Sequence, residues 1–314
     1  MKKKPSSYKL SNKFTFKAKN ILISGATGLI GKHLIPSLEK KGHNVIRLTR
    51  NPIQDQDIKW NPKSDSIDLS KAGKLDAVIH LAGESITNRR WNKSQKEKIL
   101  NSREQGTRLL SESIAKLSIP PKVLISASGI NYYDQNSNTS HTESSPPGTR
   151  FLSTVCKRWE EATSPALETN IRVCIIRIGV VLTPAGGALK KLLPFMRLGM
   201  GGRIGSGLQR MSWIAIDDLI EIISEALLND HWKGPINAVA DEPVTNKEFT
   251  HILSQLLKRP ALLPVPEILI KMLFGQMAEE TLLADLPVYS KRMPELDYKL
   301  AYPSLHKALT HLIK

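Results

Sequence analysis

Three glycines near the start of the chain have the spacing of a pyrophosphate-binding turn. Gly25, Gly28 and Gly31 form the pattern G-x-x-G-x-x-G after the apolar run from Asn20 to Ser24. Glycines at such a turn let the backbone approach phosphates, and the helix that follows offers free N–H groups to the anion. The strand, turn and helix context is the one that a dinucleotide site requires, although a turn of purely structural use has the same pattern. We therefore expect a cofactor at the backbone of Gly25, Thr27, Gly28, Leu29, Ile30 and Gly31.

The residues after the second expected strand favour NADP over NAD. In NAD-binding proteins an acidic residue at this place binds the 2′-hydroxyl of the adenosine ribose. This chain has Thr49 and Arg50 there, and an arginine suits a 2′-phosphate, with a solvated surface charge as the alternative. Further along, Leu81, Ala82 and Gly83 end the run DAVIHLAG, where small residues let the adenosine half of a cofactor cross the sheet edge.

A serine and two tyrosines offer groups for orienting a substrate oxygen and moving a proton. Ser128 follows the apolar run from Lys122 to Ser126, and Tyr132 and Tyr133 come four and five residues later. A tyrosine acts as a general acid or base most readily when a neighbouring cation lowers its pKa. No tyrosine of this chain is followed four residues later by a lysine. Tyr132 is the candidate for the acid/base group, with the alternative that the tyrosines only pack within their loop.

Two further charged groups each have two interpretations. Asp217 and Asp218 are suited to acid/base chemistry or metal binding, but they begin an expected helix, where acidic residues stabilise free N–H groups, and we favour this second role. The loop from Gly199 to Gly207, with Arg203 and Arg210, would hold an anionic substrate or act as a lid.

Strands that alternate with helices predict a Rossmann-type α/β fold with a doubly wound parallel sheet. The expected strands cover residues 20–24, 45–48, 76–81, 122–126 and 172–178. The expected helices cover residues 29–41, 94–117, 159–168, 217–228 and 246–257. His80 lies inside an apolar strand, so we expect it to be a packed core histidine.

The alternation of strands and helices weakens after residue 183, which suggests a division of the chain. We expect a basic, disordered tail over residues 1–19 and an NADP-binding Rossmann domain over residues 20–183. Residues 184–259 would form a substrate-side region interleaved with that domain. Residues 260–314 would form a small, mostly helical C-terminal cap.

Composition limits the class of protein. The 314 residues are 40% hydrophobic, and no apolar run is long enough to span a bilayer, which indicates a cytoplasmic globular protein. Cys156 and Cys174 lie outside any CxxC or Cys/His pattern, so we expect neither a disulfide framework nor a metal site. The net charge of +16 raises nucleic acid and an anionic membrane surface as partners, but the lysines are spread out and no nucleic-acid motif accompanies them, so these rank last. The sequence does not give the oligomeric state, and a homodimer is one candidate.

Several motifs occur in the order found in one protein family. They are ISGATGLIG, HLAGESI, SASGINYY, RIGVVLTP, RMSWIAIDDL and INAVADEPVTN. Together they resemble the atypical extended short-chain dehydrogenase/reductases that are similar to nucleotide-sugar epimerases and carry a C-terminal domain of unknown function. The resemblance covers the chain from Asn20 to its end. It implies that Arg103 lies near an NADP cofactor, with a surface ion pair as the alternative, and that Val181 lines the nicotinamide end. It also implies that Ser128 is the residue that orients the substrate oxygen, so that Ser128 and Tyr132 are the expected catalytic residues.

The chain departs from this family at the usual proton-transfer pair, a tyrosine with a lysine four residues later. FLSTVCKRWE places Leu152 at the tyrosine position and Cys156 at the lysine position. Lys157 is adjacent, but one residue along a helix turns a side chain by about 100°. The sequence therefore predicts an NADP-binding, epimerase-like oxidoreductase with an atypical active site, acting on an unknown small molecule of the sugar-nucleotide type. The alternative is a non-catalytic NADP-binding protein that regulates or binds another protein.

Overall fold

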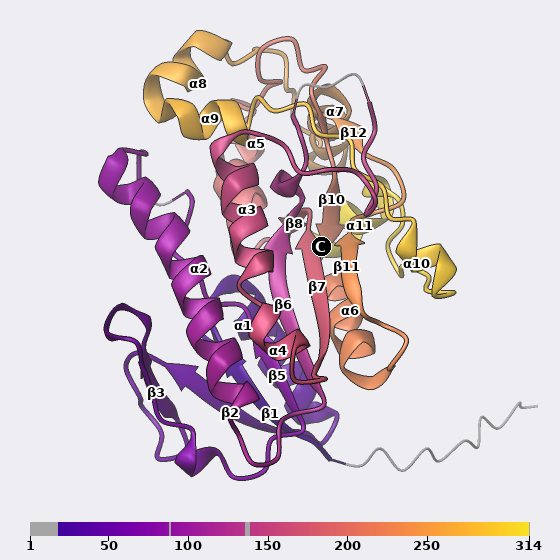
Figure 1. Cartoon of the computed structure of the whole chain (residues 1–314). Helices are drawn as coiled ribbons and strands as arrows, with labels where there is room; N and C mark the ends of the chain where they lie inside the picture. The colour runs from indigo at the N-terminus through magenta and orange to yellow at the C-terminus, as the bar shows by residue number, and fades with distance from the viewer. Residues whose placement is uncertain (1–17, 88, 136–138, 314) are drawn as a thin grey trace, which may run out of the picture.

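One eight-stranded sheet with helices on both faces forms the centre of the described chain (Figure 1). The computed structural model describes residues 18–87, 89–135 and 139–313, so most of the expected tail lies outside the described residues. The strand order is β11-β7-β6-β5-β1-β2-β3-β4, and every neighbouring pair is parallel except β3 with β4. The strands are β1 (Asn20–Ser24), β2 (Asn44–Thr49), β3 (Ile58–Asn61), β4 (Ser66–Ile67), β5 (Ala77–His80), β6 (Val123–Gly129), β7 (Arg172–Ile178) and β11 (Gly234–Ala238). This is the expected Rossmann-type fold.

Alternate residues of the central strand β1 pack on opposite faces of the sheet. Ile21 and Ile23 pack with α1 (Leu29–Lys40) and α6 (Ile216–Leu228). Leu22 packs on the other face with α2 (Lys93–Ala115) and α4 (Ser164–Leu167). α3 (Phe151–Glu161) lies beside α2 on that second face (Figure 1). Both faces of the parallel sheet are therefore covered, as its continuous apolar strands require.

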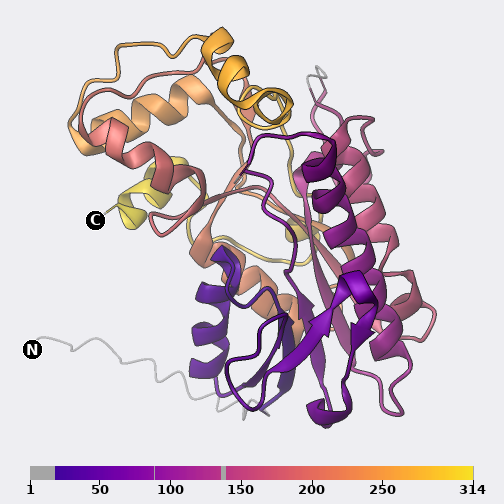
Figure 2. The same cartoon turned by 90° about the vertical axis from the view of Figure 1, so that its left-hand side faces the viewer.

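After β7 the chain builds a smaller layer at the carboxyl end of the sheet (Figure 2). β8 (Val180–Leu182) pairs with β10 (Trp213–Ala215), and β9 (Arg210–Met211) pairs with β12 (Val244–Thr245). Helices α5 (Gly187–Arg197), α7 (Asn246–Leu257) and α11 (Leu305–Leu312) share one hydrophobic core. The remaining helices are α8 (Glu267–Phe274), α9 (Gln276–Glu280), α10 (Arg292–Glu295) and the 3₁₀ turns η1 (Pro62–Ser64), η2 (Ser70–Ala72) and η3 (Ile130–Tyr132).

Most expected elements are present, and the largest error concerns α3. β7 and α7 have the expected bounds, whereas α3 begins at Phe151 instead of Trp159 and is separate from α4. The residue before α3, Arg150, supplies no capping side chain. Instead the carboxylate of Glu280 accepts a hydrogen bond from the Leu152 N–H at 2.8 Å. A cap contributed from so far along the chain leaves no local signal of the helix start.

His80 is a buried core histidine, as expected. Its side chain is fully buried, its Nδ1 lies 2.6 Å from the Ser24 hydroxyl oxygen, and its ring packs edge-on against Trp60. Burial, with a smaller effect from the charge of Arg103, lowers the pKa of His80 to about 3. The folded protein therefore keeps this ring neutral across the ordinary pH range.

The neutral state of His80 makes stability depend on pH. Between pH 6.5 and 3 the unfolded chain binds a proton at this ring and the folded chain does not, so the free energy of unfolding falls as pH falls. We expect this group to contribute a loss of about 1.4 kcal/mol per pH unit between pH 6 and 5, measured by urea unfolding. His80→Gln should flatten that slope, and His231→Gln, at an exposed histidine, should not. Equal slopes for wild type and His80→Gln would contradict the prediction.

Candidate functional site

The turn after β1 leaves backbone donors open at the carboxyl end of the sheet. Gly25 has a φ of +75°, a conformation that glycine adopts without strain. A Cβ on Gly31 would collide with the Gly25 carbonyl oxygen, so the contact between turn and helix requires glycine. Gly28 begins α1 without a capping side chain, and the first N–H groups of the helix, from Leu29 to Gly31, have no intrahelical acceptor. Thr27 and Gly28 are exposed, so an anion can reach these donors.

The end of β2 presents an exposed arginine at the same edge of the sheet. Arg50 follows Thr49, the last residue of β2, and β2 runs parallel to β1. Within the described ranges the Arg50 guanidinium has neither an ion-pair nor a hydrogen-bond partner. The Thr49 hydroxyl oxygen accepts a hydrogen bond from the Asn51 N–H at 3.3 Å. The two residues expected to bind a 2′-phosphate are therefore next to the glycine turn.

The end of β5 packs tightly on the glycine turn. A Cβ on Gly25 would lie 2.7 Å from the carbonyl carbon of Leu81 and 2.9 Å from the nitrogen of Ala82. The N–H groups of Leu81 and Ala82 both donate to the Ser24 hydroxyl oxygen, at 3.2 and 3.3 Å. Gly83, the next residue, is exposed. The structure thus places Leu81 and Ala82, which follow β5, against the turn, and Gly83 is the next residue along the chain.

Arg103 of α2 points at this edge from the neighbouring helix. A Cβ on Gly83 would lie 3.0 Å from the Arg103 guanidinium carbon. Nη1 donates to the carbonyls of Glu84 and Ile99 at 2.9 and 3.1 Å, and the guanidinium stacks 4.9 Å from the ring centre of Trp159. Burial lowers the pKa of Arg103, although Glu84 favours its charged form. The guanidinium is held by carbonyls and a ring, so the interpretation as a surface ion pair is wrong.

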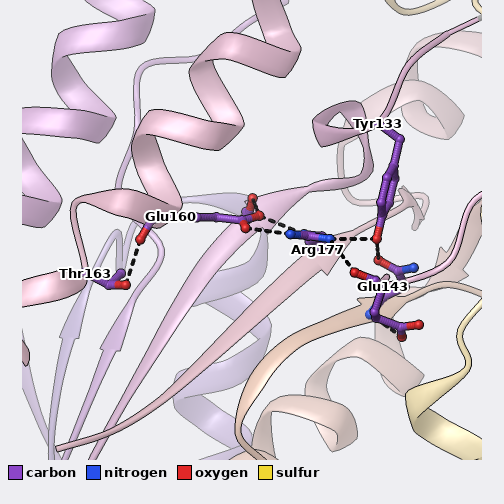
Figure 3. Close-up of polar contacts among 7 residues, drawn as sticks. Tyr133, Glu143, Glu160, Thr163 and Arg177 are labelled. Carbon is purple, nitrogen blue, oxygen red and sulfur yellow. Dashed lines mark hydrogen bonds and ion pairs between the residues drawn. The ribbon is translucent and has the colours of Figure 1, made fainter. Parts of the chain in front are cut away.

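A network of charged and polar side chains lies at the carboxyl ends of β6 and β7 (Figure 3). Buried Arg177 makes two hydrogen bonds with Glu160 of α3, from Nε to Oε1 and from Nη2 to Oε2, both 2.8 Å long. Its Nη1 donates to the Tyr133 hydroxyl at 2.8 Å, and that hydroxyl donates to Oδ1 of Asn237 at 2.7 Å. Ser128 Oγ donates to Oε1 of Glu160 at 2.7 Å. The network ties α3 to three neighbouring strands.

These hydrogen bonds determine where the protons lie. A carboxylate only accepts hydrogen bonds, so the Ser128 hydroxyl donates its hydrogen bond to Glu160 and keeps its lone pairs for another donor. Burial raises the pKa of Tyr133 to about 12, against the lowering effect of Arg177. Tyr133 therefore stays protonated as a structural partner of the network.

Tyr132 lies at the edge of the same network. Its ring centre is 3.6 Å from the Arg177 guanidinium carbon, and it meets the Tyr133 ring edge-on. Partial burial raises the pKa of the Tyr132 hydroxyl, although Arg177 opposes this change. Ser128 and Tyr132, expected as catalytic residues, thus contact the two members of one ion pair, Ser128 at Glu160 and Tyr132 at Arg177.

The usual proton-transfer pair has no counterpart on α3. Leu152 is 3% exposed, and Cys156 is buried beside Gly129. Burial raises the pKa of the Cys156 thiol to about 11, so the thiol is neutral and cannot lower the pKa of a tyrosine. Lys157 is exposed and lies 3.8 Å from Glu161. The lysine is therefore turned away from the site.

Val181 of β8 lies close to the start of α1. It pairs with Ile214 of β10 and is half-buried. A Cβ on Gly187 would lie 3.5 Å from the Val181 carbonyl oxygen and 3.6 Å from a methyl carbon of Leu29. The segment that resemblance places at the nicotinamide end is thus next to the glycine turn.

Asp217 and Asp218 have a different role from the expected one. They lie in the first turn of α6, but the helix has no side-chain cap. Buried Asp218 accepts hydrogen bonds from the N–H groups of Ala301 and Tyr302 at 2.7 and 3.0 Å. Asp217 lies 3.4 Å from His311 of α11. The pair anchors the C-terminal segment to α6.

The glycine loop after α5 is held by the C-terminal region. Arg210 forms two hydrogen bonds with Asp285, at 3.0 and 2.7 Å, and Arg203 donates to the Ser206 carbonyl at 2.7 Å. The Val265 N–H donates to the Arg203 carbonyl at 2.8 Å. The two arginines are thus engaged within the protein, which favours neither an anion site at these groups nor a freely moving lid.

Three members of the network, Arg177, Glu160 and Asn237, were not predicted from the sequence. Glu280 lies outside the network and was not predicted either; its carbonyl accepts hydrogen bonds from Asn131 and Gln135 at 3.0 Å each. One signal was available, because a charged residue in the buried run RVCIIRI must find a partner. The identity of that partner depends on which helix covers β7.

The comparison with protein families decides the relationship. The model of the NAD dependent epimerase/dehydratase family matches residues 21–238. The chain belongs to this family. A second model, of the domain of unknown function DUF1731, matches residues 265–312. The family membership and the C-terminal domain confirm the resemblance described above.

Relatives in this epimerase family match nearly the whole chain. Human epimerase family protein SDR39U1 is 36% identical over 296 residues, which cover 93% of this chain and 99% of the human one. Epimerase family protein Mb2239 of Mycobacterium bovis is 34% identical and covers 92% and 96% of the two chains. The crystal structure of the human protein with NADPH has a TM-score of 0.87 at 35% identity, covering 93% of this chain and 98% of that one.

More distant epimerases share only the fold with this chain. UDP-N-acetylglucosamine 4-epimerase of Bacillus cereus has a TM-score of 0.73 at 15% identity, covering 94% and 98% of the two chains.

Among the helices that the structure describes, none has the length and apolar character to cross a membrane.

Proposed function

We propose that this chain is an NADP-dependent oxidoreductase of the epimerase family with an atypical active site. The observation that carries the proposal is the free guanidinium of Arg50 beside the open glycine turn, which together suit a pyrophosphate and a 2′-phosphate. The crystal structure of the human relative, which contains NADPH, supports the same cofactor. The substrate would be a small molecule of the sugar-nucleotide type.

The side chains at the network favour reduction of a carbonyl group. Bound NADPH would supply a hydride, and the new alkoxide would need a proton. Tyr132 holds its proton at neutral pH and therefore has one to donate, while its contact with Arg177 opposes the rise in pKa that burial causes. Ser128, whose proton is engaged by Glu160, would accept a hydrogen bond from a substrate hydroxyl. Arg103 supplies a fixed positive charge near the position where the family's lysine would lie.

The alternative is an NADP-binding protein without catalytic activity. Buried Leu152 and neutral Cys156 favour it, because neither can take part in proton transfer. Such a protein would bind the cofactor without consuming it. The two functions share the cofactor site and differ at Tyr132.

The cofactor is tested by calorimetry with NADPH and NADH. We expect NADPH to bind more tightly, and Arg50→Ala to lose about 10- to 100-fold in NADPH affinity with little change for NADH, since one charge-assisted contact is removed. Arg108→Ala removes an exposed arginine of α2 away from the turn and should change neither affinity. Binding of neither nucleotide would refute the proposal.

Catalysis is tested by NADPH absorbance with a panel of keto sugars and nucleotide-linked keto sugars. We expect consumption with at least one of them, and a loss of about 100-fold in kcat for Tyr132→Phe with NADPH affinity retained. If wild type and Tyr132→Phe consume NADPH at the same rate, Tyr132 is not the proton donor. Binding without consumption of NADPH across the panel would favour the non-catalytic alternative.

A further inference from the structure

The C-terminal cap carries an apolar surface that the rest of the described chain leaves uncovered. α8 has the sequence EILIKMLF, and Ile270 is its only buried residue. Ile268 is 69% exposed and Met272 is 61% exposed. Leu262 and Leu263, just before the helix, are exposed as well. Burial of such side chains stabilises proteins, so this exposure points to a partner surface.

The end of α5 and the loop after it add more exposed apolar side chains. These are Phe195, Leu198, Met200 and Leu208. The backbone of Val265 joins this loop to the segment before α8, through hydrogen bonds with Arg203 and Gly205 at 2.8 and 2.9 Å. We call the exposed side chains of residues 195–208 and 258–274 the cap surface. Figures 1 and 2 show α8 at an outer end of the molecule.

Positive charge dominates the cap surface. Its basic residues are Arg197, Arg203, Lys258, Arg259 and Lys271. Its acidic residue is Glu267, which pairs with Lys271 at 2.7 Å. Arg90 adds another cation at the end of α8, with its Nε 3.5 Å from the place of a Cβ on Gly275. The partner must therefore offer apolar contact and negative charge together.

We propose that the cap surface docks on an anionic lipid bilayer. Short elements with exposed apolar side chains and a basic border bind in the headgroup region without crossing the membrane. A second copy of the chain would bring the same positive charges together. Nucleic acid would meet a mostly aliphatic surface, where Phe195 and Phe274 offer rings for base stacking but the exposed leucine, isoleucine and methionine side chains do not. Because α8 lies at an outer end of the molecule, it can contact a broad, deformable surface such as a bilayer.

The test is sedimentation of the full chain with vesicles, where phosphatidylcholine alone is compared with phosphatidylcholine containing phosphatidylserine. We expect about tenfold tighter binding to the anionic vesicles, weakened by salt. Ile268→Ser/Met272→Ser should reduce this binding about tenfold, and Arg197→Glu/Arg259→Glu should abolish the preference for anionic lipid. Ile119→Ser/Leu167→Ser changes exposed apolar residues elsewhere and should bind like wild type.

Three results would overturn the proposal. The first is wild-type binding that is absent or equal for the two vesicles. The second is unchanged binding by the α8 double variant, which would place the lipid contact elsewhere, for example in the basic tail. The third is a concentration-dependent dimer in sedimentation velocity that the α8 variant loses, which would make a second copy the occupant.

Discussion

Arg177→Met is expected to lower the free energy of unfolding by about 3–5 kcal/mol, because it leaves a carboxylate without its cation. The side chains of Arg177 and Glu160 are only 4% and 11% exposed, so water cannot replace the lost partner. The Tyr133 hydroxyl also loses the 2.8 Å hydrogen bond that Arg177 donates to it. Urea unfolding at neutral pH measures the change.

Two further variants show whether the loss comes from the unpaired charge. Arg177→Met/Glu160→Met removes both charges and should be closer to wild type than Arg177→Met alone. Lys41→Met breaks an exposed pair with Glu221 of the same 2.8 Å length and should cost at most about 1 kcal/mol. If Arg177→Met costs no more than Lys41→Met, the network does not hold α3 on the sheet as described.

Gly31→Ala is expected to weaken NADPH binding at least ~100-fold, if the glycine turn holds the cofactor as proposed. The new Cβ would collide with the Gly25 carbonyl oxygen and with the backbone of Ala26, so the turn must move. Alanine is the better helix former by about 1 kcal/mol, so helix propensity cannot explain a loss. Calorimetry with NADPH measures the affinity.

The control for this variant is a glycine of positive φ outside the turn. Gly42 has a φ of +84°, and a Cβ there would meet no atom within 4 Å. Gly42→Ala should therefore lose some stability through backbone strain and keep its NADPH affinity within about twofold. NADPH affinity of Gly31→Ala equal to that of wild type would remove the turn from the cofactor site.

The proximity of the residues proposed to bind the cofactor could be predicted because it depends on local sequence. Gly25, Gly28 and Gly31 occupy one strand-to-helix turn, and Arg50 follows the next strand along the chain. Parallel neighbouring strands end at one edge of a sheet, so predicting the alternation of strands and helices was enough to bring these residues together.

The network around Arg177 could not be predicted in the same way, because its contacts join distant parts of the chain. The Arg177–Glu160 pair depends on α3 packing over β7, and the Tyr133 hydroxyl bonds to Asn237 on the edge strand β11. Asp218 shows the same limit, since its position at a helix start predicted a cap, and its hydrogen bonds go to Ala301 and Tyr302. Hydrogen-bond partners so far apart leave no periodicity or spacing to recognise.

Glu280 contacts residues that precede it by more than 120 positions, so two parts of the candidate site, the glycine turn and the start of α3, should form at different times during synthesis. Folding during synthesis proceeds from the N-terminus, so the β1–α1–β2 unit is complete while residues after 260 are still being added. The first turn of α3 and the side chain of Asn131 gain their partner only when Glu280 has left the ribosome. A nascent chain should therefore form the turn proposed to bind the nucleotide before the start of α3 and the loop around Asn131 reach their final contacts.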